Sequence, residues 1–429
     1  MHKSLLSLTI FCTLMMFSRP QSAPQSEFRG QYLGQKTPGY KPEAFAPNIF
    51  SAWNNYGFHL QSSISLSSTG TELYFTDQTL PAVEGRSRSI MFMRRIDDTW
   101  TEPGRVPFSS DYSDWGVFCS EDGSVIYFFS TRPLHKRGAS KDADVWFIEK
   151  SENGWSEPAQ LDYPINTAYD EISGTMAGDG VIFFSSNRPG GKGGFDIYFT
   201  RIEDGAYAEP TSLGESVNTT AEERVLYVAP DLGFVIFYRL DVTEKANAGL
   251  YVTYKHGNAW TTAKSIGDHI NMLYAKGASL SPDGEYLFFL GEGYGMYWLN
   301  SEVIQYLRTA DLNISESLLE ILSEDGLKAA CSIYSDLKKK HAKYVEFNEF
   351  LLNQRGYQYL RVNDVAQAIG IFRICVALFP DSWNAYDSLG EAYLAAGESE
   401  KAKVNYLRSL ELNPRNGNAI EKLKELKTK

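Results

Sequence analysis

The sequence predicts a multidomain protein, in which an all-β propeller of five four-stranded blades is followed by an all-α stack of paired helices. The first observation is a tight turn followed by an apolar aromatic strand, which recurs five times. The turn glycines are Gly70, Gly123, Gly180, Gly233 and Gly284, spaced 53, 57, 53 and 51 residues apart. Such a period, with several short strands in each repeat, is typical of a propeller. The second observation is a change to helical periodicity after residue 300.

Each period is expected to supply four strands. The second strand follows the turn, as in residues 126–129, and a polar loop leads to the third strand, as in residues 144–147. An aromatic residue then opens the expected fourth strand, which covers residues 100–103, 155–158, 207–210 and 260–263. Proline occupies this strand in three of the four copies, which suits an outer edge strand. The regular placement of these aromatic residues indicates packing rather than sugar stacking.

The fifth period lacks a fourth strand, because the sequence turns helical at residues 301–308. A ring left open there would expose a sheet edge that can pair with another chain. Residues 39–47, Gly-Tyr-Lys-Pro-Glu-Ala-Phe-Ala-Pro, are similar to the missing strand and precede the first blade at the spacing of the other fourth strands. The sequence therefore predicts that this N-terminal segment closes the ring.

The propeller pattern resembles the TolB-type, WD-like β-propeller repeat over residues 40–300. The strongest match is residues 185–198, Ser-Ser-Asn-Arg-Pro-Gly-Gly-Lys-Gly-Gly-Phe-Asp-Ile-Tyr, and residues 130–133 with 144–146 are a looser copy. The fourth blade departs from the pattern, since Arg239 stands alone and no aspartate opens the strand at Gly249. The resemblance implies an interaction module of the cell envelope, or a propeller domain that accompanies a hydrolase domain.

The C-terminal part contains two segments that align at a spacing of 34 residues. The matched pairs are Gly356 with Gly390, Tyr359 with Tyr393, Ala368 with Ala402, Phe372 with Tyr406, and Pro380 with Pro414. This pattern resembles tetratricopeptide repeats over residues 349–416, with a capping helix at 416–427 and a degenerate helix pair at 315–340. Ser382 and Ser399 are expected near helix starts, as caps. The predicted domains are a signal peptide at 1–23, the propeller at 24–300, a helical linker or degenerate repeat at 301–345, and the repeats at 346–429.

Composition limits the classes of partner and the compartment. The net charge of −12 argues against a nucleic-acid partner, because phosphate binding needs a basic face. Lys3 followed by the apolar residues 5–17 is typical of a secretory signal peptide and is too short to span a bilayer. We therefore expect an exported bacterial protein, periplasmic or secreted, with no transmembrane anchor after cleavage. Cys119, Cys331 and Cys375 are too few and too far apart for a disulfide framework and are expected to be buried.

Catalytic and metal-binding motifs are not found in the sequence. The histidines have no metal-ligand spacing such as H-E-x-x-H, and no G-x-S-x-G nucleophile elbow occurs. The glycine-rich residues 190–194 precede a strand rather than a helix, so we expect a loop with positive φ angles instead of a phosphate site. No cofactor and no metal ion are predicted.

Charged residues nevertheless converge on one face of the predicted ring. The loops before the innermost strands and the loops between second and third strands lie on the same face, and they carry Asp114, Glu171, Glu223, Arg132, Arg188 and Lys192. These residues could bind a polar ligand or a peptide. The structural alternative is that Arg132 pairs with Asp144, and Arg188 with Asp196, to hold the loops. A second candidate surface is the inner face of the helical stack, with Asn353, Tyr357, Asn384 and Asp387.

Two interaction folds without a catalytic signature predict a non-enzymatic binding or scaffold protein of the cell envelope. Its expected partners are proteins, with glycans as a further class. The alternative is a hydrolase that acts on glycans or small esters at the mouth of the propeller channel. Two carboxylates within about 5–10 Å of each other there would favour the hydrolase.

Overall fold

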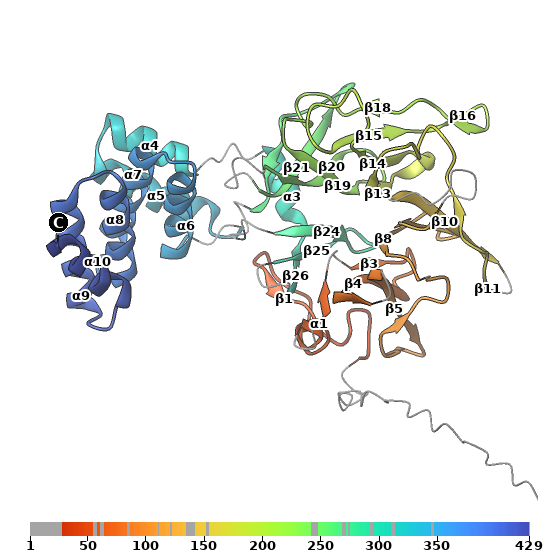
Figure 1. Cartoon of the computed structure of the whole chain (residues 1–429), viewed down its shortest axis with the longest axis horizontal. Helices are drawn as coiled ribbons and strands as arrows, with labels where there is room; N and C mark the ends of the chain where they lie inside the picture. The colour runs from red at the N-terminus through yellow and green to blue at the C-terminus, as the bar shows by residue number, and fades with distance from the viewer. Residues whose placement is uncertain are drawn as a thin grey trace, which may run out of the picture.

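A five-bladed ring of antiparallel sheets and a C-terminal stack of helices make up the molecule (Figure 1). The computed structural model describes residues 28–428, with gaps at 55–57, 61–63, 84–85, 110, 121, 134–141, 152–153, 242–247, 268–271, 273–274, 292–294, 310–313 and 345–346. The expected signal peptide lies outside the described residues. The predicted fold class, a propeller of four-stranded blades followed by helices, is confirmed.

Each blade runs from the ring centre outward in chain order, except that the last blade takes its outer strand from the N-terminal segment. Blade 1 comprises β3 (Ser65–Leu66), β4 (Glu72–Val83), β5 (Arg86–Ile96) and β7 (Gly104–Arg105); blade 2 comprises β8 (Asp114–Cys119), β9 (Val125–Ser130), β10 (Asp144–Ser151) and β12 (Ala159–Gln160). Blade 3 comprises β13 (Glu171–Met176), β14 (Ile182–Ser186), β15 (Asp196–Thr200) and β18 (Thr211–Ser212). Blade 4 comprises β19 (Glu222–Val228), β20 (Phe234–Leu240), β21 (Gly249–His256) and β23 (Lys264–Ser265); blade 5 comprises β24 (Lys276–Leu280), β25 (Tyr286–Leu290), β26 (Met296–Asn300) and β1 (Glu43–Ala44).

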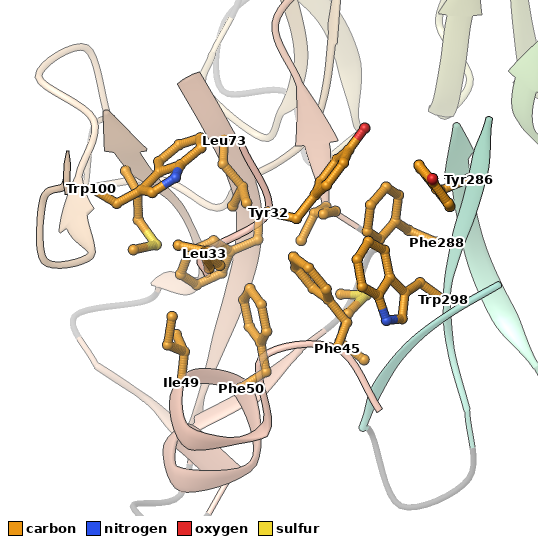
Figure 2. Close-up of a cluster of buried hydrophobic side chains, with 14 of the residues drawn as sticks. Tyr32, Leu33, Phe45, Ile49, Phe50, Leu73, Trp100, Tyr286, Phe288 and Trp298 are labelled. Atoms are coloured by element: carbon orange, nitrogen blue, oxygen red, sulfur yellow. The ribbon is translucent and has the colours of Figure 1, made fainter. Parts of the chain in front are cut away.

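The N-terminal segment closes the ring as predicted. Strand β1 pairs antiparallel with β26, with Glu43 opposite Trp298, and the Phe45 N–H donates to the Met296 carbonyl at 2.8 Å. Helix α1 (Pro47–Asn54) follows and leads into β2 (Phe58–Leu60), which pairs with β4. Aromatic side chains of the segment meet those of blades 1 and 5 in one core, in which Phe45 lies 4.9 Å from Trp298 between ring centroids (Figure 2).

The outer strands lie a few residues later than the sequence predicted. Trp100 is in β6 (Thr99–Trp100), which extends the end of β5 as a small hairpin, and the edge strand β7 begins only after Pro103. The short strands β11 (Gly154–Trp155), β17 (Ala206–Tyr207) and β22 (Ala259–Trp260) repeat this arrangement; β17 pairs with β16 (Ile202–Glu203). The aromatic residue and the edge strand are therefore two separate pairings in blades 1 to 4. In blades 1 to 3 a proline, which has no N–H for the ladder, lies between them.

The C-terminal helices confirm the paired arrangement expected from the 34-residue spacing. They are α4 (Ile314–Glu324), α5 (Leu327–His341), α6 (Glu349–Arg361), α7 (Val365–Leu378), α8 (Trp383–Ala395), α9 (Ser399–Leu412) and α10 (Gly417–Thr428). Gly356 and Gly390 are needed because the rings of Phe372 and Tyr406 press against them. Ser382 caps α8 as predicted, whereas Ser399 is the first residue of α9 and does not act as its cap.

Helix α3 (Glu302–Thr309) packs in the propeller core, although it lies in the segment 301–345 that the sequence predicted to be a helical linker or degenerate repeat. Val303, Ile304 and Leu307 are buried among residues of blades 4 and 5. Tyr306 of α3 is hydrogen-bonded through its hydroxyl to His341 Nδ1 at the end of α5, and its ring stacks on that of Tyr344, three residues beyond α5, at 4.3 Å between centroids. This helix therefore joins the ring to the helical stack.

The three described cysteines differ in burial. Cys375 is fully enclosed in the helical core, while Cys119 and Cys331 are half-buried, which corrects the expectation for these two. None of the three forms a disulfide, as predicted.

Candidate functional site

The three predicted acids of the ring lie at the same end of neighbouring innermost strands. Asp114 opens β8, Glu171 opens β13, and Glu223 is the second residue of β19. In the adjoining second strands they lie opposite Ser130, Ser186 and Arg239, respectively. The innermost strands β8, β13 and β19 contact one another in ring order.

In blade 3, the Glu171 carboxylate is bound inside the protein by three neighbouring residues. Ser186 Oγ donates to Glu171 Oε1 at 2.7 Å, and Arg188 Nη2 forms an ion pair with the same oxygen at 3.2 Å. Thr167 donates its backbone N–H at 3.1 Å and its hydroxyl at 2.9 Å. Arg188 also donates to two backbone carbonyls of the loop before β13, at 3.1 and 2.6 Å. The network ties that loop to the innermost and second strands.

The same arrangement recurs in blades 2 and 4. In blade 2, Asp114 Oδ1 accepts from Ser130 Oγ at 2.6 Å and from Arg132 Nη2 at 3.0 Å. In blade 4, Arg239 takes the strand position of the serine, and its Nε donates to Glu223 Oε1 at 2.9 Å. We call these three networks the ring latches. Each arginine also stacks on two aromatic rings of its blade at 4.6–5.4 Å, and these are Phe128 and Trp146, Phe184 and Tyr198, and Phe237 and Tyr251.

The latch carboxylates are closed to solvent. The side chains of Asp114, Glu171 and Glu223 are 0% exposed, and those of the three arginines are 10–15% exposed. Burial raises the pKa of Glu171, while the hydrogen bonds from Ser186 and Thr167 and the charge of Arg188 oppose that rise. A ligand can touch these carboxylates only after a latch has opened.

The ion pairs in the ring latches differ from the two that the sequence analysis proposed as a structural role for these arginines. The expected pairing of Arg188 with Asp196 is wrong, since Arg188 binds Glu171. Asp196 Oδ2 instead accepts the backbone N–H groups of Lys192 and Gly193 at 2.8 and 3.2 Å. For Arg132, the ion pair reaches Asp114 on the innermost strand, rather than the predicted Asp144. The two arginines therefore hold the loops, as predicted, but their partners are Asp114 and Glu171.

The glycine-rich loop of blade 3 wraps an internal carboxylate, that of Asp196. Of its glycines only Gly190 has the expected positive φ, at +93°. Gly193 is required for another reason, because a Cβ there would lie 1.7 Å from the Ala221 carbonyl oxygen of blade 4. Lys192, the remaining predicted residue of this face, is half-exposed and its Nζ lies 2.5 Å from Glu215 Oε1.

Replacing Gly193 by alanine is expected to destabilise the propeller by about 1–3 kcal/mol, because the loop must move away from blade 4 to admit the methyl group. Urea unfolding measures this change. Gly39→Ala is the matched control, since a Cβ at Gly39 meets nothing within 4 Å. Equal unfolding midpoints for the two variants would show that the contact between the loop and blade 4 is not tight.

Residues that complete the latches were missed in the sequence, although a signal for them exists. Asn166 binds both the N–H and the carbonyl of Val145, at 2.8 and 2.9 Å, and Asn218 binds Ile197 in the same way. An Asn-Thr pair precedes the latch acid at the same distance in blades 3 and 4, at residues 166–167 and 218–219. This repeated Asn-Thr pair with its following glutamate is the pattern that could have identified the network.

The predicted groove residues also take part in an internal polar network. Tyr357 Oη donates to Glu391 Oε2 at 2.6 Å, and Asn418 Nδ2 donates to Glu391 Oε1 and to Asp387 Oδ2, each at 2.8 Å. These bonds join α6, α8 and α10 across the inner face. Asn384 Nδ2 donates to the Glu349 carboxylate at 3.0 Å.

Asn353 differs from the other groove residues. It is half-buried on α6, and its Oδ1 has no hydrogen-bond partner among the described residues. Of the four predicted groove residues, it is therefore the one with a buried side-chain oxygen that no described residue binds.

Two surface cavities lie away from these predicted residues. One of about 480 Å³ is lined by Tyr334, Lys338 and Phe379 of the stack, and one of about 350 Å³ by Phe92, Phe108 and Trp155 of blades 1 and 2. Within the described ranges, no group of histidine, cysteine and acidic side chains could hold a metal ion. In the same part of the chain, no helix has the length and apolar character needed to cross a bilayer.

No protein-family model matches the chain, and no curated protein matches it. Among solved structures, the first TPR domain of human RPAP3 is 26% identical, covers 27% of this chain and 87% of its own length, and gives a TM-score of 0.20. A protein of unknown function from Dyadobacter fermentans is 16% identical over 58% of this chain and 81% of its own, with a TM-score of 0.35. An alpha-L-arabinofuranosidase from Lactobacillus brevis is 15% identical over 53% of this chain and 83% of its own, with a TM-score of 0.32.

Proposed function

We propose that the protein is a non-enzymatic binding or scaffold protein of the bacterial cell envelope, exported by its N-terminal signal and related to TolB-type propellers. Its partners are proteins, which the helical groove and the ring face hold at separate sites, and glycans are a further ligand class. The observation that carries this proposal is the burial of the ring acids, whose carboxylates are 0% exposed and bound within the latches.

The latches argue against the hydrolase alternative. A general acid or nucleophile must come within hydrogen-bond distance of the substrate. The raised pKa of Glu171 would suit an acid, but its two oxygens already accept bonds from Ser186, Thr167 and Arg188. Catalysis would therefore require an arginine to leave its aromatic site first. A binding protein needs no such opening if its partners contact the ring face and the helical groove through side chains other than the three latch acids.

Capture from envelope extract with the full mature chain tests the proposal. We expect Asn353→Ala to weaken capture of a specific partner by about fivefold or more, since its buried Oδ1 lacks a hydrogen-bond donor among the described residues and a bound partner can supply one. Asn405→Ala is the matched control, because Asn405 lies on α9 and already binds the Lys401 carbonyl. If both variants capture the partner equally, the groove is not the site. Turnover of a glycan or ester substrate that Glu171→Gln abolishes, in a variant that still folds, would support the hydrolase instead.

A further inference from the structure

The cavity of about 350 Å³ between blades 1 and 2 lies at the end of the blades opposite to the ring latches. Blade 1 lines it through its second and third strands, and blade 2 lines it through the hairpin of β10 and β11. At this end the Lys150 N–H donates to the carbonyl of Ser124, in the turn before β9, whereas the latch arginine Arg132 follows the other end of β9. The volume falls within the range of about 300–1,000 Å³ that is typical of pockets for small ligands.

Four aromatic residues line the cavity. Phe92 of β5 stacks on Tyr74 of β4 at 6.4 Å between ring centroids. Phe108, in the link between the two blades, packs against the buried Phe128 at 5.3 Å, and Trp155 of β11 adds a ring from the hairpin. Since their neighbours hold Phe92 and Phe108 in place, these walls do not have to be formed by a ligand. Such walls favour a flat apolar group.

Two cations lie over these rings. The Arg94 guanidinium is 6.0 Å from the centroid of Phe92, and Lys150 Nζ is 5.4 Å from the centroid of Trp155. Arg94 is neutralised by Glu72, which it meets at 2.9 Å. Lys150 is exposed, and no carboxylate among the described residues forms an ion pair with it. The cavity therefore carries one uncompensated positive charge, which favours an anionic ligand.

The lining disfavours two other classes of ligand. A cationic ligand would meet like charges, because Arg94 and Lys150 already occupy ring faces. A sugar would bury several hydroxyl groups that need partners. Among the described residues of the lining, the only other polar side-chain groups are the Tyr74 hydroxyl, which already donates to Glu72 at 3.0 Å, and the Trp155 indole N–H.

We infer that this cavity binds a small aromatic carboxylate. Its ring lies among Phe92, Phe108 and Trp155, and its carboxylate pairs with the Lys150 ammonium. The apolar contact supplies most of the affinity, and the charge-assisted hydrogen bond to Lys150 selects an acid over its neutral analogues. The site goes beyond the proposed partner binding, because it uses neither the ring latches nor the helical groove.

Lys255 of blade 4 offers a matched control for Lys150. It lies opposite Trp260 in the hairpin of β21 and β22, as Lys150 lies opposite Trp155, and its Nζ is 4.8 Å from the Trp260 ring centroid. Both lysines therefore stack on the aromatic residue of their hairpin, and only Lys150 lines the cavity between blades 1 and 2. If stacking were the whole role of Lys150, Lys150→Gln and Lys255→Gln would behave alike.

Isothermal titration of the full chain with 3-phenylpropionate, and separately with its neutral amide, tests the inference at constant ionic strength. We expect the acid to bind saturably and the amide to bind about tenfold more weakly, because it lacks the charge that Lys150 attracts. Acetate, which has the carboxylate without the ring, should bind more weakly than either. Lys150→Gln should weaken binding of the acid about tenfold and leave binding of the amide unchanged, which also shows that the cavity is intact in this variant. Lys255→Gln should leave both affinities unchanged.

The inference is overturned by any of three results. These are a native chain that does not bind 3-phenylpropionate, an amide that binds as tightly as the acid, and a Lys150→Gln variant that binds the acid as tightly as Lys255→Gln does. Each of these results leaves the capture of a partner by the helical groove unaffected, so the two proposals can be separated.

Discussion

Removal of residues 28–50 is expected to abolish cooperative folding of the propeller at 25 °C. The segment supplies the outer strand of blade 5 and six buried apolar side chains, which are Phe28, Tyr32, Leu33, Phe45, Ile49 and Phe50. Burial of one such side chain contributes about 1.5–3 kcal/mol. Their combined loss, about 9–18 kcal/mol, is therefore as large as the net stability of about 5–15 kcal/mol that a folded domain has. Far-ultraviolet circular dichroism during a urea titration measures the outcome.

A single substitution in the N-terminal segment tests the closure of the ring with a smaller expected loss of stability. Phe45 is 1% exposed and contacts the rings of Phe50, Phe288 and Trp298 (Figure 2). Phe45→Ala should lower the unfolding free energy by about 3–5 kcal/mol. Phe350→Ala is the control, because Phe350 is 51% exposed on α6 and its loss should have little effect. A truncated chain that melts like the intact protein would contradict the closed ring.

The closing strand could be predicted from the sequence, but the rest of the N-terminal packing could not. Residues 39–47 carry the same aromatic and proline pattern as the other outer segments, so their role follows from the repeat. Phe28, Tyr32 and Leu33 belong to no repeat. Tyr32 contacts Tyr286 at 5.3 Å between ring centroids, across more than 250 residues of sequence. A contact of that kind depends on how the ring closes and leaves no local periodicity.

The charged residues of the ring face were predicted as a group, while their partners were not. The repeat shows that the acids precede the innermost strands and that the arginines follow the second strands. It does not show that Arg188 turns back over Phe184 to reach Glu171, because that depends on side-chain rotamers and on aromatic stacking.

The burial of helix α3 could have been predicted from the sequence, because Val303, Ile304 and Leu307 form one apolar stripe on the helix. The stripe indicates burial, and the structure shows that the propeller buries it.

Glu171→Ala is the second change with a large expected effect. The substitution leaves the Arg188 guanidinium, 13% exposed, without its counter-ion, and leaves Ser186 Oγ without the carboxylate to which it donates. Breaking a buried ion pair by removal of one partner typically costs about 3–5 kcal/mol. Guanidinium unfolding of the full chain should show this loss in the propeller transition. A midpoint equal to that of the native chain would mean that Glu171 does not stabilise blade 3.

The most direct test of a structural role for the ring acids is a double-mutant cycle on Glu171 and Arg188. The cycle compares Glu171→Ala, Arg188→Ala and the double variant, and isolates the energy that couples the pair. Arg408 and Glu411, an exposed pair on α9 at 2.7 Å, serve as the matched control, and their coupling should be close to zero. We predict a coupling energy of about 2 kcal/mol or more for Glu171 and Arg188, as for a buried pair whose single variants leave an uncompensated charge. If the coupling energy is as small as that of the exposed pair, in variants that still fold, Glu171 and Arg188 do not stabilise each other. The ring acids would then be candidates for ligand binding again.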